Sequence, residues 1–178
     1  MNNSQIADHF TMLSKLMDIH GENSFKAKTY SIAAYHIEKL PEPLSQTNRG
    51  SIAGIKGIGS SVASKVVELL DTGKLGVLDE YITNTPAGVI EMLHLKGLGP
   101  KKIHTIWKEM DIQSIGELEY ACNENRLTRY KGFGEKTQAN VLESIKFYNQ
   151  NIGHFLYSQI EPLYPVIKEY LGKLFGEN

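Results

Sequence analysis

The sequence predicts an all-α protein of short helices, and three observations agree on this fold class. Apolar residues recur at steps of three and four positions, as in Ile6, Phe10, Leu13 and Met17. Runs with a period of two, which would predict strands, are scarce. Glycine and proline interrupt the apolar pattern at short intervals, which limits the length of each predicted helix.

Start and stop signals delimit the predicted helices along the chain. Ser24 precedes a predicted helix that carries Tyr30, and Ser114 with Glu117 predicts a capping box before another helix. Predicted helix ends lie at Pro41 and Pro43, at Gly73, and at Thr85 with Pro86. The chain therefore consists of helices separated by turn residues.

An internal repeat is the most informative feature of the sequence. The segments 55–59, 95–99 and 130–134 share one order, namely a bulky residue, lysine, glycine, an apolar residue and glycine. Each segment precedes a predicted helix. The apolar residues nine positions beyond the first glycine are Val66, Ile106 and Val141. Three matched copies predict three examples of one packed unit.

The Gly-apolar-Gly order suits a turn that approaches a ligand closely, since glycine adopts positive φ and has no Cβ. The helix that follows exposes free N–H groups and the positive end of its dipole, which together favour an anion. Nucleic-acid phosphates can be held in this way without any base being read. The candidate DNA-binding residues at the hairpins are Gly57, Gly59, Ser60, Ser61, Gly97, Gly99, Lys101, Lys102, Gly132, Gly134 and Lys136.

Two other interpretations of the repeat are weaker. A single Gly-x-Gly is typical of a helix C-cap, but three matched copies favour a binding unit. A dinucleotide-binding loop would need a preceding strand and a third glycine, and the sequence contains no GxxxxGK[ST] loop.

Net charge and composition restrict the kind of binding surface. With 19 basic and 20 acidic residues the formal net charge is −1, so DNA contacts must come from local clusters of basic residues. No apolar run of about eighteen residues and no secretory signal occurs, so the sequence predicts a cytoplasmic protein without membrane contact. The single cysteine, Cys122, is predicted to be a buried apolar residue, and no histidine has the spacing of a metal site.

The three hairpins resemble the helix-hairpin-helix motif of DNA repair proteins. That resemblance implies contacts to the DNA backbone and a monovalent cation held by hairpin carbonyls. The carbonyls of Ile55, Ile58, Leu95 and Leu98 would then hold K⁺ or Na⁺.

The segments GENSFKAKTYSIAAYHIEKLP, GIGSSVASKVVELLDTGKL, GLGPKKI and KGFGEKTQ further resemble the opening of family X DNA polymerases, especially bacterial ones. The resemblance runs from about Ile6 to Tyr148. It implies a lyase-type helical domain over 1–84, a helical fingers-type domain over 85–150, and the start of a palm-like region over 151–178.

In that family the first domain binds the 5′-phosphate side of a DNA gap, and the next domain grips the duplex around the primer. The implied partner is gapped, nicked or 5′-phosphorylated DNA. Lys26 and Tyr30 match the positions where the family places a 5′-phosphate pocket.

The polymerase centre of the family is not expected in this chain. Such a centre needs paired carboxylates that hold two Mg²⁺ ions, and none of the five aspartates forms an Asp-x-Asp sequence. We therefore expect a piece of a longer polymerase, with Mg²⁺ required only by the full-length enzyme and no cofactor in this chain.

Lyase chemistry is an alternative function. In eukaryotic members of the family, a lysine in the helix after the first hairpin forms a Schiff base with an abasic sugar, and Lys65 matches it. Lys65 borders the apolar face of its predicted helix, so partial desolvation would favour its neutral, nucleophilic amine. Ser61 and Val77 stand where the family often has basic residues, which weakens this interpretation.

A third alternative is a protein-interaction scaffold, in which residues 151–178 mediate self-association through a predicted apolar helix. We also expect a hinge near Thr83 to Gly88. Of the three hairpins, the first is expected on the 5′-phosphate side of a gap, the second on the primer side, and the third in a mainly structural role.

Overall fold

The computed structural model describes residues 1–151 and 164–175, and the chain divides into two compact units, residues 1–145 and 146–178. The described residues form helices and no strand, so the predicted all-α class is confirmed. The α-helices are α1 (Asn3–Ile19), α2 (Ser24–Glu38), α3 (Ser60–Thr72), α4 (Gly76–Thr83), α5 (Ala87–Glu91), α6 (Pro100–Lys108), α7 (Ile115–Asn123), α8 (Glu135–Asn151) and α10 (Tyr164–Phe175). The 3-10 helices are η1 (Leu44–Gln46), η2 (Arg49–Gly54), η3 (Met92–His94) and η4 (Leu127–Arg129).

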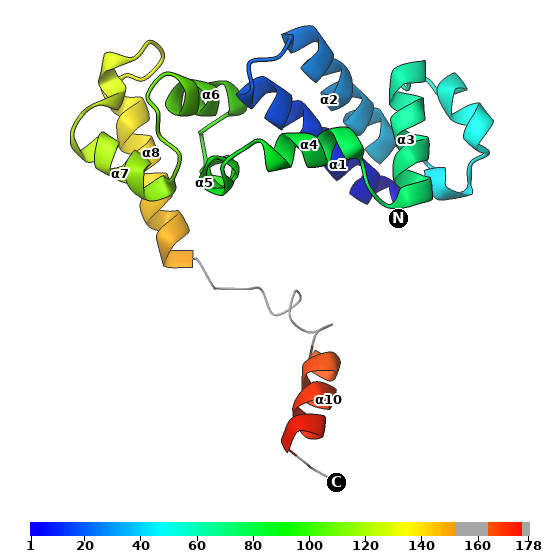
Figure 1. The fold of residues 1–178 in the computed structure, drawn as a ribbon. Coiled ribbons are helices and arrows are strands. Elements are labelled where there is room, and N and C mark those ends of the chain that lie inside the picture. Colours follow the sequence, from blue (N-terminus) through cyan, green and yellow to red (C-terminus); the bar gives the residue numbers. More distant parts are fainter. Residues whose placement is uncertain (152–163, 176–178) are drawn as a thin grey trace. The chain divides into compact units, whose positions relative to one another are not determined.

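Helices α1 and α2 pack side by side and form the centre of the first unit (Figure 1). The apolar stripe predicted for α1 is buried, and the ring of Phe10 stacks on Tyr30 of α2 with centroids 6.0 Å apart. Between the two helices, the buried hydroxyl of Ser14 donates a hydrogen bond of 2.8 Å to the Ala27 carbonyl. This bond satisfies the one polar group that the apolar face of α1 carries into the core.

The two predicted helix starts agree with the structure in position, but only one of them has the predicted cap residue. The N-cap of α2 is Asn23, and the predicted start residue Ser24 is already helical. Ser114 caps α7 as predicted, with its hydroxyl accepting the Glu117 N–H at 3.2 Å. The reciprocal half of the predicted capping box is wrong, because the Glu117 carboxylate accepts the N–H of Gln113 instead.

Glycines end two of the helices in the left-handed conformation. Gly73, with φ of +72°, ends α3 as predicted. Gly21, with φ of +76°, follows α1, and the N–H groups of Gly21 and Glu22 bond the carbonyls of Asp18 and Met17. This Schellman motif was missed in the sequence, although a glycine after a helical apolar pattern is its usual signal.

The three repeats form three copies of one unit, as predicted. Val66, Ile106 and Val141 are all buried in the helices that follow the turns. The repeat also extends backwards, because each turn follows a 3-10 helix whose buried residue lies three positions before the bulky residue. These residues are Ile52, Met92 and Leu127.

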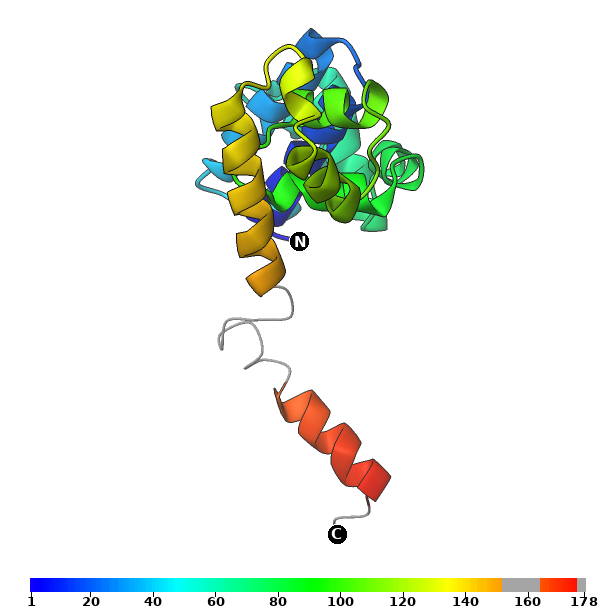
Figure 2. The same cartoon turned by 90° about the vertical axis from the view of Figure 1, so that its left-hand side faces the viewer.

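Helices α6, α7 and α8 gather at the end of the first unit away from α3 (Figures 1 and 2). Cys122 of α7 is buried as predicted, and burial raises the pKa of its thiol to about 11. Gln138 of α8 is buried where the other two repeats have Ala63 and Ile103, and its amide donates to the Asn125 side chain at 2.7 Å. The third repeat is thus the only one of the three with a polar group at this core position.

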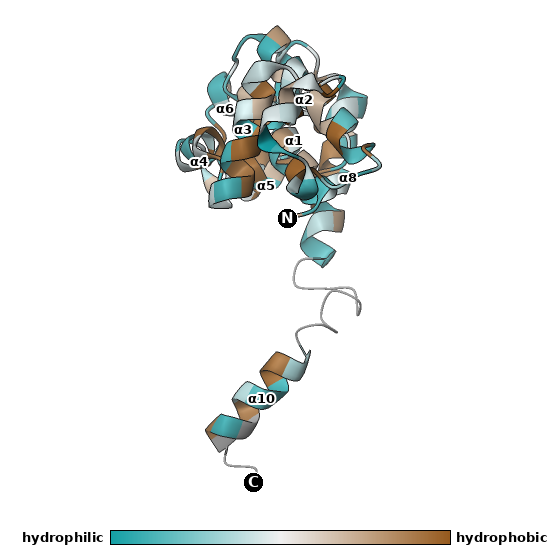
Figure 3. Cartoon of the chain, turned by 90° about the vertical axis from the view of Figure 1, so that its right-hand side faces the viewer, coloured by the Kyte–Doolittle hydropathy of each residue, from teal (hydrophilic) through white to brown (hydrophobic). Residues whose placement is uncertain are grey.

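In the second unit, α10 exposes the apolar side chains Tyr164, Val166, Ile167, Tyr170, Leu171 and Leu174, which alternate along it with polar ones (Figure 3). Phe155, Leu156, Ile160 and Leu163, also part of the predicted apolar helix, lie outside the described residues. Predicted self-association through 151–178 stays a prediction. Within 1–151 and 164–175, no helix combines the length and apolar character needed to cross a bilayer.

Candidate nucleic-acid interface

The three hairpin turns share one backbone geometry. The first glycine of each turn is left-handed, with φ of +88° at Gly57, +82° at Gly97 and +89° at Gly132. In each turn the N–H of the apolar residue bonds the carbonyl of the bulky residue, at 3.0, 3.2 and 3.1 Å in chain order. The apolar residue between the glycines, Ile58, Leu98 or Phe133, is at most 4% exposed. The turn is therefore anchored in the core by this side chain, while both glycines remain exposed.

The helices that follow the turns begin with free backbone donors. Gly59 and Gly99 are extended N-cap residues, and neither α3 nor α6 has a side chain that caps its first turn. Ser60 and Ser61 are exposed at the start of α3, whereas α6 has a proline at its first position. The positive end of each helix dipole consequently faces solvent beside the turn, as the sequence predicted for an anion site.

Exposed lysines surround these turns. Lys101 and Lys136 are exposed, but Lys102 is half-buried with its amine 5.9 Å from the Phe133 ring centroid. The predicted DNA-binding residues did not include the lysine of the repeat itself. The structure exposes all three copies, Lys56, Lys96 and Lys131. The described ion pairs, Arg49–Asp71 and Lys173–Glu169, use none of these amines.

The first hairpin turn and the helix after it, α3, both lie against α2. A Cβ added at Gly57 would overlap with the His36 imidazole, so the turn lies directly against that ring. The amine of half-buried Lys65 lies 5.9 Å from the Tyr30 ring centroid. Tyr30 is 5% exposed, and Lys26 is exposed one helical turn before it on α2. The fold thus brings Lys65 of α3 to the part of α2 that carries the predicted 5′-phosphate residues.

The predicted cation ligands are backbone oxygens of the first two turns. The carbonyls of Ile55 and Leu95 each accept the turn N–H, from Ile58 and Leu98 respectively, and each oxygen keeps a second lone pair. Oxygen donors of this kind fit a monovalent cation. No three His, Cys, Asp or Glu side chains in the described ranges are grouped closely enough to hold a metal ion.

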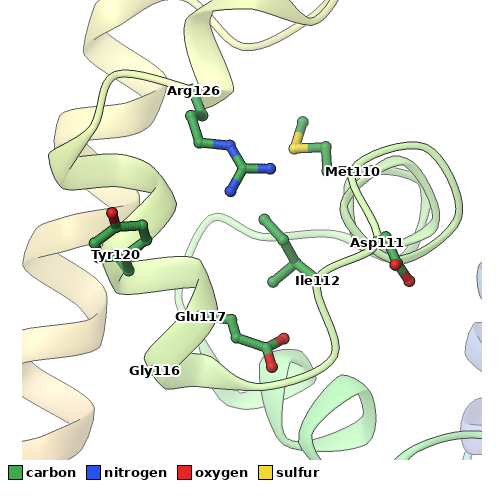
Figure 4. Close-up of a pocket in the computed structure, with 7 residues that line it drawn as sticks. All are labelled: Met110, Asp111, Ile112, Gly116, Glu117, Tyr120 and Arg126. Atoms are coloured by element: carbon green, nitrogen blue, oxygen red, sulfur yellow. The ribbon is translucent and has the colours of Figure 1, made fainter.

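A separate hollow of about 340 Å³ lies between the end of α6 and α7 (Figure 4). Its wall carries Asp111 and Glu117 as well as Arg126, and Met110 and Ile112 supply apolar surface. The mixture of charges does not resemble the hairpin surfaces, which present lysines and backbone N–H groups. The sequence contains no motif that predicts this hollow.

Two family descriptions match the chain. Residues 1–75 match a helix-hairpin-helix domain, and residues 89–146 match a SAM-like helix-hairpin-helix tandem. The first match contains the first hairpin, and the second match contains the other two.

Similar curated proteins cover most of the chain. It is 28% identical over 145 residues to the DNA polymerase/3′-5′ exonuclease PolX of Bacillus subtilis (strain 168), an alignment that covers 82% of this chain and 25% of that protein. It is 25% identical over 142 residues to DNA polymerase lambda of Rattus norvegicus, covering 79% of this chain and 23% of that protein. The chain thus spans about a quarter of the length of these relatives.

The contrast between Gly57 and Gly97 yields a prediction about stability. Gly97→Ala should lower the free energy of unfolding by roughly 1–2 kcal/mol, because alanine is strained at positive φ but meets no atom within 4 Å. Gly57→Ala should cost more, since the His36 ring must also move. Denaturant unfolding of the two variants measures the difference, and equal losses would contradict the close packing of Gly57 on His36.

Proposed function

We propose that this chain, whose sequence and helix-hairpin-helix domains match the amino-terminal region of family X DNA polymerases, binds gapped or nicked DNA through its phosphates. The observation that carries the proposal is the repeated geometry of the three turns. Each one presents a left-handed glycine, an uncapped or exposed helix start and a lysine beside it.

Backbone donors of this kind favour binding without sequence preference. An N–H group at a helix start bonds a phosphate oxygen and makes no contact with a base edge. The exposed lysines add attraction that salt screens. A net charge of −1 restricts this attraction to the hairpins, so we infer that the hairpins, and not a general basic surface, carry the affinity.

The salt dependence of binding tests the role of the hairpin lysines. Lys101→Gln should weaken binding to any DNA sequence and reduce the slope of log affinity against log salt by about 1, because one phosphate contact is lost. Fluorescence anisotropy over a series of salt concentrations measures the slope. Lys15→Gln is the matched control, since Lys15 is an exposed lysine of α1 outside the hairpins. An equal effect of both substitutions would refute a specific role for Lys101.

Recognition of a gap is the finer part of the proposal. Lys65 of α3 lies near the buried ring of Tyr30 on α2, and Lys26 is exposed one helical turn before that ring. The two amines would bind a dianionic terminal phosphate. The first hairpin would then bind the downstream strand of the gap and the second hairpin the primer side. A K⁺ or Na⁺ ion held by the carbonyls of the turns would add a positive charge next to the phosphate.

A comparison of DNA ends tests gap recognition. A gapped duplex with a 5′-phosphate should bind at least about fivefold more tightly than the same gap with a 5′-hydroxyl, as expected for a charge-assisted contact of about 1 kcal/mol. Lys26→Gln should reduce this ratio and leave affinity for intact duplex unchanged. Equal affinity for the gap and for intact duplex would rule out gap recognition while leaving duplex binding in place.

Deoxyribose-phosphate lyase activity is the second candidate, favoured by the half-buried position of Lys65 against the Tyr30 ring. The Lys65 amine would add to the sugar aldehyde, and loss of water would form a Schiff base. Loss of a proton from the adjacent carbon would then break the bond to the 3′ oxygen and release the phosphate strand. Water would finally hydrolyse the Schiff base and restore the amine.

Borohydride trapping tests the lyase. Reduction during incubation with incised abasic DNA should give a covalent complex that denaturing electrophoresis detects, and Lys65→Ala should abolish it. Lys15→Ala should not affect the complex, because Lys15 lies outside the candidate site. If wild-type protein binds this DNA but forms no adduct, the lyase proposal is wrong and the binding proposal stands.

A further inference from the structure

Within the first unit, His20 and His104 connect the end of α1 to α6, the helix that follows the second hairpin turn. The Nδ1 atom of His104, on α6, lies 2.9 Å from the Ile19 carbonyl, and because a carbonyl only accepts, Nδ1 must carry the proton. Ile19 is the last residue of α1, so its carbonyl has no partner within the helix. His104 therefore satisfies a group that the end of α1 leaves open.

The second histidine, His20, lies between two aromatic rings. Its imidazole contacts Tyr81 of α4 and Trp107 of α6 edge-to-face, with centroids 5.0 and 5.1 Å away. Its Nε2 lies 2.8 Å from the hydroxyl oxygen of Thr85, and that hydroxyl donates its only hydrogen to the Tyr81 carbonyl. His20 must therefore donate through Nε2, which defines its neutral tautomer.

The contact of the end of α1 with α6, which we call the junction, cannot accommodate a side chain at Gly21. A Cβ at this position would lie 2.8 Å from Cε1 of His104, and the residue already has a positive φ of +76°. The Schellman turn and the His104 ring are therefore in direct contact. The end of α1 and the side of α6 can approach each other in this way only because residue 21 lacks a side chain.

The junction lies beside the second hairpin and is connected to the first hairpin through α1 and α2. Helix α6 begins at the second turn, and His104 follows Gly99 by five residues, a rise of about 7.5 Å along the helix. On the other side, α1 packs on α2, and α2 contacts the first hairpin turn through His36 and lies near Lys65 of α3 through Tyr30. The two histidines thus connect the elements that carry the two candidate phosphate sites.

We propose that His20 and His104 are positioning residues that hold the first and second hairpins at one spacing, and that this spacing makes the chain prefer one gap length. The inference rests on the proposed binding of gapped DNA. A phosphate on each side of a gap is separated by a distance that depends on the number of missing nucleotides. A rigid junction matches one such distance, whereas a loose junction accepts several.

The charges around His20 make the junction sensitive to pH. Burial lowers the pKa of His20 below 6.5, and Lys108 and His104 lower it further, while Glu22 acts in the opposite direction. Tyr81 stays neutral, because burial and its hydrogen bond with Glu22 raise its pKa to about 12. Since the folded state binds the proton of His20 less readily than the unfolded state, the junction is intact above pH 6.5 and weakens as the pH falls toward the folded-state value.

The experiment measures affinity for a series of 5′-phosphorylated gaps of increasing length, with the full chain and at one salt concentration. Wild-type protein should prefer one length over the others by at least about fivefold, a typical coupling between two sites. His104→Ala should flatten this profile. His104→Asn should restore it, because the asparagine amide can donate to the Ile19 carbonyl from a position close to that of Nδ1. A thermal melt of each variant establishes that it is folded.

The pH dependence separates positioning from a general loss of stability. Below pH 6.5 the preference of the wild-type protein for one gap length should decline. The preference of His20→Gln should decline less, because glutamine keeps a donor for Thr85 but has no imidazole to protonate. His9→Ala is the control, because the His9 ring bonds only the Gln5 carbonyl within α1.

The outcomes distinguish this inference from the proposed function. Failure of the wild-type protein to bind any gapped DNA would overturn the proposed function. Binding with equal affinity to all gap lengths, or an unchanged length profile in folded His104→Ala, would overturn the positioning role alone.

Discussion

The positive φ of the first glycine in each hairpin is the constraint on which the rest of the structure depends. It turns the backbone so that the next residue, Ile58, Leu98 or Phe133, enters the core, and a helix begins two residues later. Any side chain at the first position would strain this turn. The same geometry that buries the apolar residue directs the N–H groups of the helix start to solvent, so packing and the candidate phosphate contact follow from one backbone conformation.

This arrangement explains how a chain with slightly more acidic than basic residues can be a candidate DNA-binding protein. The N–H groups of a helix start supply partial positive charge that the formal net charge does not count. One lysine in each repeat lies exposed beside these groups. The charge that matters is therefore local, and an average over the sequence does not reveal it.

The three hairpins are alike in their turns but differ in what surrounds them. Gly57 lies against His36, whereas Gly97 and Gly132 have open space where a Cβ would be. The third hairpin contributes Phe133 to a contact with Lys102 of the second, and its helix buries Gln138. Because the surroundings differ, the same turn can occupy different positions relative to one DNA molecule. The proposed contacts on both sides of a gap would require such different positions.

The sequence by itself determined the helical class, the three repeats, the buried residues Val66, Ile106 and Val141, and the resemblance to family X polymerases. These features are local or periodic, so glycine positions and apolar spacing are enough to predict them. Only the tertiary structure decided that Lys65 lies beside Tyr30 and that His20 and His104 join the two hairpin regions. The bonds of His20 and His104 connect residues 65 and 85 positions apart, and no spacing rule relates residues that meet only after helices pack.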